Sequence, residues 1–160
     1  SVLQLDAHTD LRPEYHGSPY NHACAVYAAS QNCNLVHVGI RSMDAEEKQY
    51  IQPGNCFFAH QMWDNEDWMD ASIARLSEKV YLTIDLDAFD PALMPATGTP
   101  EPGGMGWYET LKYLRRVFQE REVVGFDIVE LAPHTAHKAS NFLAAKLYYK
   151  LLSYKFEDGK

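Results

Sequence analysis

The sequence predicts an α/β fold with three layers, in which helices cover both faces of a mainly parallel sheet. Short β-rich runs alternate with longer helical segments along the 160 residues, giving five strands that are each followed by a helix. Such alternation is typical of parallel sheets whose strands are joined by crossover helices. Polar clusters follow two of these strands, where the ligand sites of such sheets lie. We therefore expect residues 1–160 to form a single domain with a site at the carboxyl end of the sheet.

The first part of the chain contains two strand–helix pairs. Val2–Leu5 is a short apolar run and predicts a strand. The alanine-rich segment 22–31 predicts a helix, because alanine has the highest helix propensity. Leu35–Ile40 ("LVHVGI") is rich in β-branched residues and predicts a second strand. Residues 44–51 predict a short helix, in which Asp44 is the expected N-cap.

The middle of the chain repeats this pattern. Residues 56–59 predict a brief buried strand, and residues 80–84 ("VYLTI") predict another strand. Residues 65–76 lie between them and predict a helix. The side chains available for an apolar face of this helix are Trp68, Ile73 and Leu76.

The last part of the chain begins with a long loop rich in Pro and Gly, "PALMPATGTPEPGGMG" at residues 91–106. Loops of this length inside compact domains are usually functional. Residues 107–121 predict a helix, residues 123–129 the fifth strand, and residues 139–155 a closing amphipathic helix.

The chain is acidic, with 22 Asp and Glu residues against 14 Lys and Arg residues. A nucleic-acid partner is not expected, because phosphate neutralisation needs a basic surface. The net charge of −8 suits a divalent cation or a small cationic substrate, although it also serves solubility alone. No apolar run approaches a membrane span and no signal peptide is visible, so no membrane partner is expected. The three cysteines form no Cys-x-x-Cys pair, which predicts reduced thiols and a cytoplasmic location.

Acidic and imidazole side chains are concentrated after the first and fourth predicted strands. Asp6, His8 and Asp10 occupy alternate positions after the first strand, and Asp85 and Asp87 follow the fourth. Because strand side chains alternate between faces, each set can converge on one side. Loop capping, turn chemistry or solvation explains either set alone. The two sets together, at the ends of strands, predict a divalent metal site.

The ligands of this site are four carboxylates and one imidazole. So many carboxylates cannot all stay ionised in a tight cleft without a cation. The oxygen-rich set favours Mn²⁺ over structural zinc, and it contains enough ligands for two ions bridged by shared carboxylates. A water between two such ions loses a proton near neutral pH and becomes a strong nucleophile.

Three ordered motifs resemble those of the ureohydrolases, the family of arginase and agmatinase. They are "LDAHTDLRPEY" at residues 5–15, "TIDLDAFDPALMPATGTPEPGG" at residues 83–104 and "GFDIVELAP" at residues 125–133. The resemblance covers nearly the whole chain. It implies an arginase-like fold and a two-manganese centre that hydrolyses a guanidinium group to urea and an amine.

The resemblance also implies a role for each of the five metal ligands. Asp6 and Asp85 would bridge both metals. His8 and Asp87 would complete the shell of one metal, and Asp10 would bind the other.

Two further residues receive catalytic roles from the resemblance. Glu130 matches the acidic residue that holds the guanidinium group, and a carboxylate pairs well with this planar cation. His22 falls where the family keeps a His that assists proton transfer, which suits the pKa of imidazole. Without the resemblance, Glu130 would be interpreted as a strand-end carboxylate paired with an Arg, and His22 as the start of its helix.

The remaining acidic and imidazole residues are expected to be structural. Asp90 precedes Pro91 and is expected to shape the long loop, and Asp127 is expected to be a structural partner near its strand end. Surface or buried structural roles are expected for the other histidines, which are His16, His37, His60, His134 and His137.

The expected substrate is agmatine, with arginine and guanidinobutyrate as open alternatives. Arginases usually follow the first motif with an Asn that reads the amino-acid head group, whereas this chain has Leu-Arg at residues 11–12. Two departures leave the substrate open. Ala-Cys at residues 23–24 replaces the usual Gly and small hydroxyl residue after His22, and Thr-Ala at residues 135–136 stands where agmatinases often carry Tyr-Asp.

The family's earlier Gly-Gly-Asp-His motif, whose His binds one metal, occurs nowhere in these 160 residues. The N-terminal strands of the arginase-like fold are also missing. We therefore expect the sequence to be the C-terminal portion of such a domain, with one weakened metal site. Homo-oligomers are expected, because the first strand, exposed without its preceding neighbours, could pair with another chain and because the family forms them.

Two alternatives stay open at this point. One is a catalytically incomplete fragment that acts only as a metal-binding or interaction module, because one His ligand is missing. The other is a metallohydrolase of the same three-layer fold with a mononuclear zinc site, such as a deacetylase. The signature around Glu130 argues against the second alternative.

Overall fold

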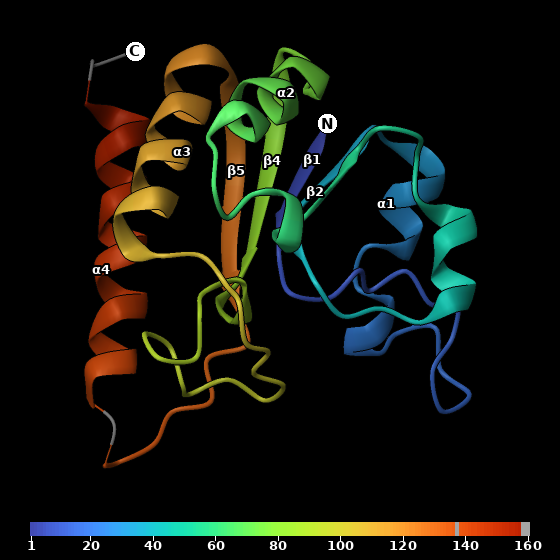
Figure 1. The fold of residues 1–160 in the computed structure, drawn as a ribbon, viewed down its shortest axis with the longest axis horizontal. Helices are drawn as coiled ribbons and strands as arrows, with labels where there is room; N and C mark the ends of the chain where they lie inside the picture. The colour runs from blue at the N-terminus through green and yellow to red at the C-terminus, as the bar shows by residue number, and fades with distance from the viewer. Residues whose placement is uncertain (137, 158–160) are drawn as a thin grey trace.

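A computed structural model describes residues 1–136 and 138–157 of the chain (Figure 1). Its centre is a parallel sheet of five strands in the order β3-β2-β1-β4-β5, which confirms the predicted fold class. The strands are β1 (Val2–Leu5), β2 (Leu35–Ile40), β3 (Cys56–Phe58), β4 (Lys79–Asp85) and β5 (Glu122–Val129). The first strand of the sequence lies in the middle of the sheet and pairs with β2 and β4, so the expectation of an exposed first strand open to another chain is wrong.

Helical segments follow each strand, as predicted. The α-helices of the described chain are α1 (Tyr27–Asn32), α2 (Asp67–Arg75), α3 (Trp107–Glu120) and α4 (Lys138–Phe156). Shorter 3₁₀ helices are η1 (His22–Cys24), η2 (Ala45–Tyr50), η3 (Ala59–Gln61) and η4 (Leu86–Ala88). The expected N-cap of η2 is confirmed, because Asp44 accepts a hydrogen bond from the N–H of Glu46 at 3.1 Å. In turn, the side chain of Glu47 accepts a hydrogen bond from the N–H of Asp44 at 2.7 Å, which completes a capping box.

The expected helix at residues 22–31 is divided in two. The Asn21 side chain accepts from the N–H of Ala23 at 3.3 Å and caps the separate turn η1. The backbone then leaves the helical region at Val26, whose φ is −110° and ψ is 7°. The N–H of Val26 bonds to the carbonyl of Asp10 instead. This contact with a distant loop overrides the local helix propensity of the alanines.

Two other elements are present but differ in burial from the prediction. Strand β3 is half-buried, because it lies at the edge of the sheet and pairs only with β2. Helix α4 is not amphipathic, because aromatic side chains also lie on its outward face. The exposed aromatic residues of α4 are Phe142, Tyr148, Tyr149 and Phe156.

Two hydrophobic clusters place helices on opposite faces of the sheet. The larger cluster packs Leu3 and Leu5 of β1 against residues of α2, α3 and α4. The smaller cluster packs Val2 and Leu35 against residues of α1 and the end of η2. Because alternate residues of a strand face opposite sides, these clusters define two helical layers around the sheet. Figure 1 shows α3 and α4 on one side of the strands and α1 on the other.

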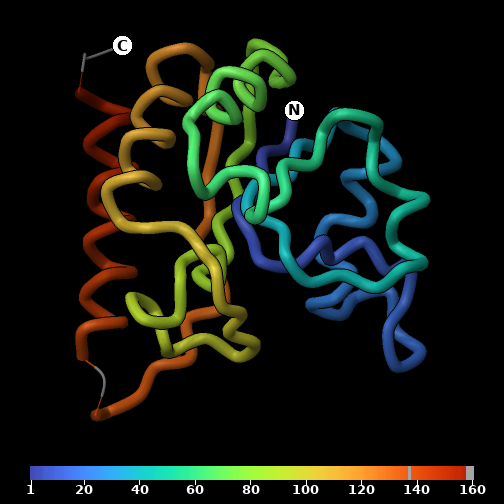
Figure 2. The backbone as a smooth tube through the Cα atoms, in the orientation of Figure 1, coloured from blue at the N-terminus to red at the C-terminus, as the bar shows by residue number. Residues whose placement is uncertain are grey.

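The loops that follow β1, β4 and β5 gather at the end of the sheet opposite the N-terminus (Figure 2). This end is the carboxyl edge of the parallel strands, where the polar clusters were expected. None of the helices in the described part of the chain combines the length and the apolar character that a bilayer span requires.

Candidate metal centre

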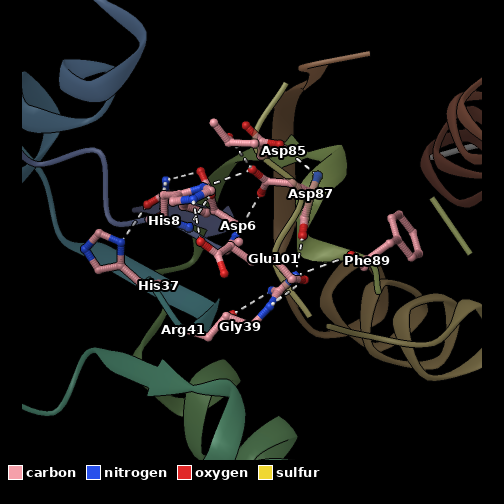
Figure 3. Close-up of polar contacts among 12 residues, drawn as sticks. Asp6, His8, His37, Gly39, Arg41, Asp85, Asp87, Phe89 and Glu101 are labelled. Atoms are coloured by element: carbon pink, nitrogen blue, oxygen red, sulfur yellow. Dashed lines mark hydrogen bonds and ion pairs between the residues drawn. The ribbon is translucent and has the colours of Figure 1, made fainter. Parts of the chain in front are cut away.

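The carboxyl ends of β1 and β4 lie side by side and carry the two predicted ligand sets. The two strands pair in register up to the residues that precede Asp6 and Asp85. Both carboxylates therefore follow at the same edge of the sheet. Figure 3 shows Asp6 and His8 lying beside Asp87, with Asp85 next to them.

Three of the predicted ligands form one compact group. Ligand atoms of Asp6, His8 and Asp87 all lie within 4.8 Å of one another. Nδ1 of His8 is 2.9 Å from a carboxylate oxygen of Asp87 and 3.6 Å from one of Asp6. Asp6 and Asp87 are both buried, whereas His8 is half-buried and accessible from the cleft. One nitrogen and several carboxylate oxygens at this spacing are ligands that Mn²⁺ accepts.

Backbone N–H groups at the strand ends hold the carboxylates of this group. Asp6 accepts from the N–H of His8 at 2.6 Å, and Asp87 accepts from the N–H of Ala7 at 3.0 Å. Asp85 accepts from the N–H of Asp87 at 2.8 Å. The contact between Ala7 and Asp87 ties the end of β1 to the end of β4. Asp6 and Asp85 are therefore held by the turn after their own strand, and Asp87 by the turn after β1.

Asp10 and Asp85 lie next to the compact group and line the same cleft. Asp85 is buried and Asp10 is half-buried. Asp10 has a φ of 51°, a left-handed conformation that Asp tolerates better than most residues. The charges of Asp6 and Asp87 act on both residues. The structure thus brings all five predicted ligands to one place, and their assignment to two separate ions stays a prediction.

The electrostatics of the site reflect crowded, buried carboxylates. Burial raises the pKa of Asp85 to about 10 and that of Asp10 to about 8, and repulsion from Asp6 adds to both shifts. Burial also raises the pKa of Asp6 to about 6. Hydrogen bonds to Asp6 and Asp87 raise the pKa of His8 to about 10. Hydrogen bonds from His8 and Ala7 outweigh burial at Asp87, so the pKa of that carboxyl lies below its ordinary value.

The donor set fits a divalent cation. Among the described residues, no Lys or Arg side chain forms an ion pair with these carboxylates; the imidazole of His8 lies within ion-pair distance of Asp6 and Asp87, and the guanidinium of Arg41 acts on both from farther away. Ionised carboxylates at this spacing repel one another unless a cation lies between them. A bound divalent ion would stabilise the ionised carboxylates and so lower their pKa values.

His22 and Glu130 line the same cleft as the ligands, and the cleft has a volume of about 640 Å³. Both side chains are exposed to solvent within it. Glu130 adopts a left-handed φ of 62° at the turn after β5. A Cβ on Gly98 would lie 3.3 Å from a carboxylate oxygen of Glu130, so this glycine leaves room for the acidic side chain. The catalytic roles of His22 and Glu130 stay predictions, while their position in the cleft agrees with those roles.

The residues expected to be structural have structural partners. Asp90 accepts hydrogen bonds at 2.9, 2.9 and 3.2 Å from three backbone N–H groups of its own loop. Asp127 accepts from the hydroxyls of Tyr81 and Thr83 at 2.8 and 2.6 Å. Of the histidines expected to be structural, His16, His60 and His134 are exposed. His137 lies outside the described residues.

Sequence reasoning missed Gln4, and it gave His37 a surface or buried structural role without its contact near the ligands. Gln4 donates from Nε2 to a carboxylate oxygen of Asp6 at 2.6 Å, and Nδ1 of His37 lies 2.6 Å from Oε1 of Gln4. The strand period could have found Gln4, because residues 4 and 6 share a face of β1. The contact with His37 depends on the pairing of β1 with β2, which the local sequence does not contain.

Arg41 and Glu47 also support the site from a distance. The guanidinium of Arg41 donates to the backbone carbonyls of Asp87 and Glu101, both at 2.7 Å. It therefore anchors the loop after β4 to the end of β2 (Figure 3). The buried carboxylate of Glu47 accepts from the N–H of Leu11 at 2.8 Å and holds the loop after β1.

Known proteins resemble this chain over nearly its whole length. The model of the arginase family matches residues 1–153. A Synechocystis sp. protein named N(1)-aminopropylagmatine ureohydrolase is 45% identical over 158 residues, which are 96% of this chain and 52% of the relative. A Pyrococcus horikoshii protein named agmatinase is 35% identical over 95% of this chain and 54% of its own length.

Solved structures share the fold. The crystal structure of agmatine ureohydrolase from Thermoplasma volcanium has a TM-score of 0.84 and 31% identity, and the match covers 97% of this chain and 54% of that protein. This chain spans about half the length of the curated relatives that it matches. The family match, the sequence identity and the shared fold agree with the motifs at the candidate metal centre. This chain belongs to the arginase family.

Proposed function

We propose that the protein hydrolyses a guanidino compound to urea and an amine in a manganese-dependent reaction. The observation that carries this proposal is the convergence of Asp6, His8 and Asp87 at the wall of a cleft that His8, Asp87 and Glu130 line. An oxygen-rich ligand set favours manganese over structural zinc. Membership of the arginase family supports the same reaction class.

The chain's own residues supply the remaining parts of the reaction. Asp6, His8, Asp10, Asp85 and Asp87 would hold two divalent ions. Bound manganese would act as a Lewis acid and lower the pKa of water toward neutral pH. Glu130 binds the guanidinium through paired charge-assisted hydrogen bonds. His22 donates a proton from its imidazolium to the departing amine.

Agmatine is the substrate that we propose first. It is a small cation, and among the described lining residues of the acidic cleft the one Lys or Arg side chain that could pair with a substrate carboxylate is Arg12. Arg12 is engaged with Asp44 at 3.1 Å. This arrangement disfavours arginine and guanidinobutyrate, which both carry a carboxylate.

A second substrate has an observation of its own. Relatives from Synechocystis sp. and Thermus thermophilus, at 45% and 40% identity, carry the name N(1)-aminopropylagmatine ureohydrolase. N(1)-aminopropylagmatine is agmatine extended by an aminopropyl group, and a cleft of about 640 Å³ is large enough for either molecule. Both compounds are therefore compared in the test below.

The proposal includes one domain over residues 1–160, a cytoplasmic location and a homo-oligomeric assembly without nucleic-acid or membrane partners. The cysteines Cys24, Cys33 and Cys56 are all unpaired, which supports a reducing compartment. The alternative is a catalytically incomplete module that binds metal or a protein partner without turnover.

Urea release with added Mn²⁺ tests the proposal. We expect urea from agmatine or N(1)-aminopropylagmatine, and little or none from arginine and guanidinobutyrate. Glu130→Gln should lower kcat/KM by roughly 10- to 100-fold, because it removes a charge-assisted contact to the guanidinium while the metal content is unchanged. Glu122→Gln, an exposed carboxylate at the start of β5, is the matched control and should leave activity as it is.

Three outcomes separate the alternatives. Two equivalents of bound Mn²⁺ with turnover support the hydrolase. One equivalent or none, without urea from any of the four compounds, supports the catalytically incomplete module and overturns the proposed function. Urea release that Glu130→Gln does not change would contradict the role given to this residue.

A further inference from the structure

A buried polar chain crosses from β2 to the metal centre. His37 and Gln4 are register partners in the parallel pair formed by β1 and β2. Their exposed fractions are 1% and 2%, so neither side chain exchanges its hydrogen bonds with solvent. Nδ1 of His37 lies 2.6 Å from Oε1 of Gln4, and Nε2 of Gln4 lies 2.6 Å from a carboxylate oxygen of Asp6. The chain thus runs His37–Gln4–Asp6.

The chemistry of an amide fixes the direction of both bonds. Oε1 of Gln4 can only accept, and Nε2 can only donate. Nδ1 of His37 must therefore carry the proton in the first bond. With the amide reversed, Oε1 would face the ionised carboxylate of Asp6 at 2.6 Å without a proton between the two oxygens. Only one orientation of Gln4 thus satisfies both neighbours.

His37 is suited to hold this orientation without adding charge. Burial lowers the pKa of His37 to about 4, so the ring is neutral at pH 7. A neutral imidazole with hydrogen on Nδ1 donates one bond to Gln4. Glutamine side chains have many rotamers, and a buried donor on one side of the amide selects among them.

The chain completes the hydrogen bonding of Asp6. One carboxylate oxygen of Asp6 accepts from Gln4, and the other accepts from the N–H of His8 at 2.6 Å. With a donor on each oxygen, the carboxylate cannot rotate freely, and its remaining lone pairs are left for a cation. Partners of this kind orient metal ligands and typically change metal affinity about 10- to 100-fold.

We infer that Gln4 is a positioning residue for Asp6, and that His37 fixes the Gln4 amide through an Nδ1–H donor. This inference rests on the proposed metal centre, which it deepens. Neither residue lines the substrate cleft, so both act on the reaction through the ligands, chiefly through Asp6; Nε2 of Gln4 also makes a longer contact of 3.4 Å with the backbone carbonyl of His8.

Metal affinity of matched variants tests the inference. Gln4→Met keeps the length of the side chain and removes both polar atoms, and His37→Leu removes the donor. Each should weaken Mn²⁺ binding, measured by calorimetry, by about 10- to 100-fold. His37→Asn places an amide N–H close to the position of Nδ1 and should restore most of the affinity. Because His37 acts through Gln4, the double variant should bind Mn²⁺ no more weakly than Gln4→Met alone.

Thr83→Val is the matched control. Thr83 is the other register partner of Gln4, on β4, but its hydroxyl donates to Asp127 and not to Asp6. This variant also loses a polar group in the same row of the sheet. It should leave the affinity for Mn²⁺ unchanged, so a general loss of sheet stability is distinguished from a loss of positioning.

Imidazole ¹⁵N chemical shifts of His37 in the unsubstituted, metal-free protein provide a second measurement that does not depend on variant folding. We expect hydrogen on Nδ1 and none on Nε2. An unprotonated Nδ1, or additive effects of the two substitutions on Mn²⁺ affinity, would overturn the inference. If the unsubstituted protein binds no Mn²⁺, the proposed function fails, and the tautomer alone then decides whether His37 orients Gln4.

Discussion

At the scale of single residues, the site is a cluster of carboxylates whose protonation depends on what lies between them. Asp85 is buried beside Asp6 and Asp87, and its pKa rises to about 10. The carboxylate of Asp85 accepts a hydrogen bond from the N–H of Asp87. This bond lowers the pKa of Asp85 by less than burial raises it. Without a cation, the folded protein therefore retains protons that an unfolded chain releases near pH 4.

This difference predicts a pH dependence of stability for the chelator-treated protein. A raised carboxyl pKa contributes stability that is fully present below about pH 4 and is lost as the pH rises toward about 10. His8, with a pKa of about 10, loses its contribution over the upper part of the same window, from its unfolded value of about 6.5. The free energy of unfolding should therefore fall from pH 7 to pH 9, by up to about 1.4 kcal/mol per pH unit for each retained proton.

Asp85→Asn tests the contribution of one residue to this slope. The amide does not titrate, so urea unfolding of the chelator-treated variant should show a shallower decline between pH 7 and pH 9. Some slope should remain, because Asp10 and His8 still titrate in this window. Asp64→Asn, at an exposed carboxylate, is the control and should keep the original slope. If the free energy of unfolding falls equally steeply with pH in Asp85→Asn, the raised pKa of Asp85 is contradicted.

At the scale of elements, the long loop after β4 is held from a neighbouring strand end. Arg41 follows β2 and donates to carbonyls of Asp87, Glu101 and Pro102 at 2.7, 2.7 and 3.0 Å. The loop packs tightly on this side chain, because a Cβ on Gly104 would lie 2.7 Å from the guanidinium and 2.5 Å from backbone atoms. A planar guanidinium with five donors can reach several carbonyls at once, which an ammonium group cannot reproduce.

Arg41→Lys should therefore loosen the loop and the ligand that it carries. We expect the free energy of unfolding to fall by about 1–3 kcal/mol, because several carbonyls lose a charged donor. Mn²⁺ affinity should also fall, since the carbonyl of Asp87 belongs to the same residue as the ligand. Limited proteolysis within residues 91–105 should become faster.

Arg121→Lys is the matched control for this loop. Arg121 also donates to backbone carbonyls, those of Ile73 and Glu120 at 2.7 Å, but it lies at the end of α3. This variant should lose a similar amount of stability and keep its Mn²⁺ affinity. An equal loss of Mn²⁺ affinity in both variants would show that Arg41 has no specific effect on the site.

At the scale of the whole molecule, the candidate metal centre joins segments that are far apart in the sequence. The ligands after β1 and those after β4 are separated by about eighty residues and meet because their strands are neighbours in the sheet. A cation that binds them stabilises the folded chain, because the unfolded chain keeps these ligands apart.

Mn²⁺ should therefore raise the stability of the chain. At a free concentration one hundred times the dissociation constant, the free energy of unfolding should rise by about 2.7 kcal/mol, visible as a higher Tm. Asp87→Asn should remove most of this gain, whereas Asp127→Asn should keep it, because Asp127 bonds to Tyr81 and Thr83 away from the ligands. A gain that survives Asp87→Asn would place the stabilising ion elsewhere.

Local patterns were sufficient to locate the strands and the ligand sets. The period of two after β1 and β4 predicts that Asp6, His8 and Asp87 converge, and their ligand atoms lie within 4.8 Å of one another because a strand end projects alternate side chains to one side. The cap at Asp44 was also local, since an acidic side chain directly preceded the helix. The helix expected at residues 22–31 was wrong in its continuity, because a hydrogen bond from Val26 to a distant loop interrupts it.

By itself, the sequence determined the fold class and, through its motifs, the family, and it predicted which residues would hold a divalent ion. Only the tertiary structure decided that Gln4 and His37 support Asp6, that Arg41 holds the loop after β4, and that β3 is an edge strand. The physical reason is that ligand spacing is a property of one strand end. Strand order and register, in contrast, follow from packing between segments that are distant in the sequence.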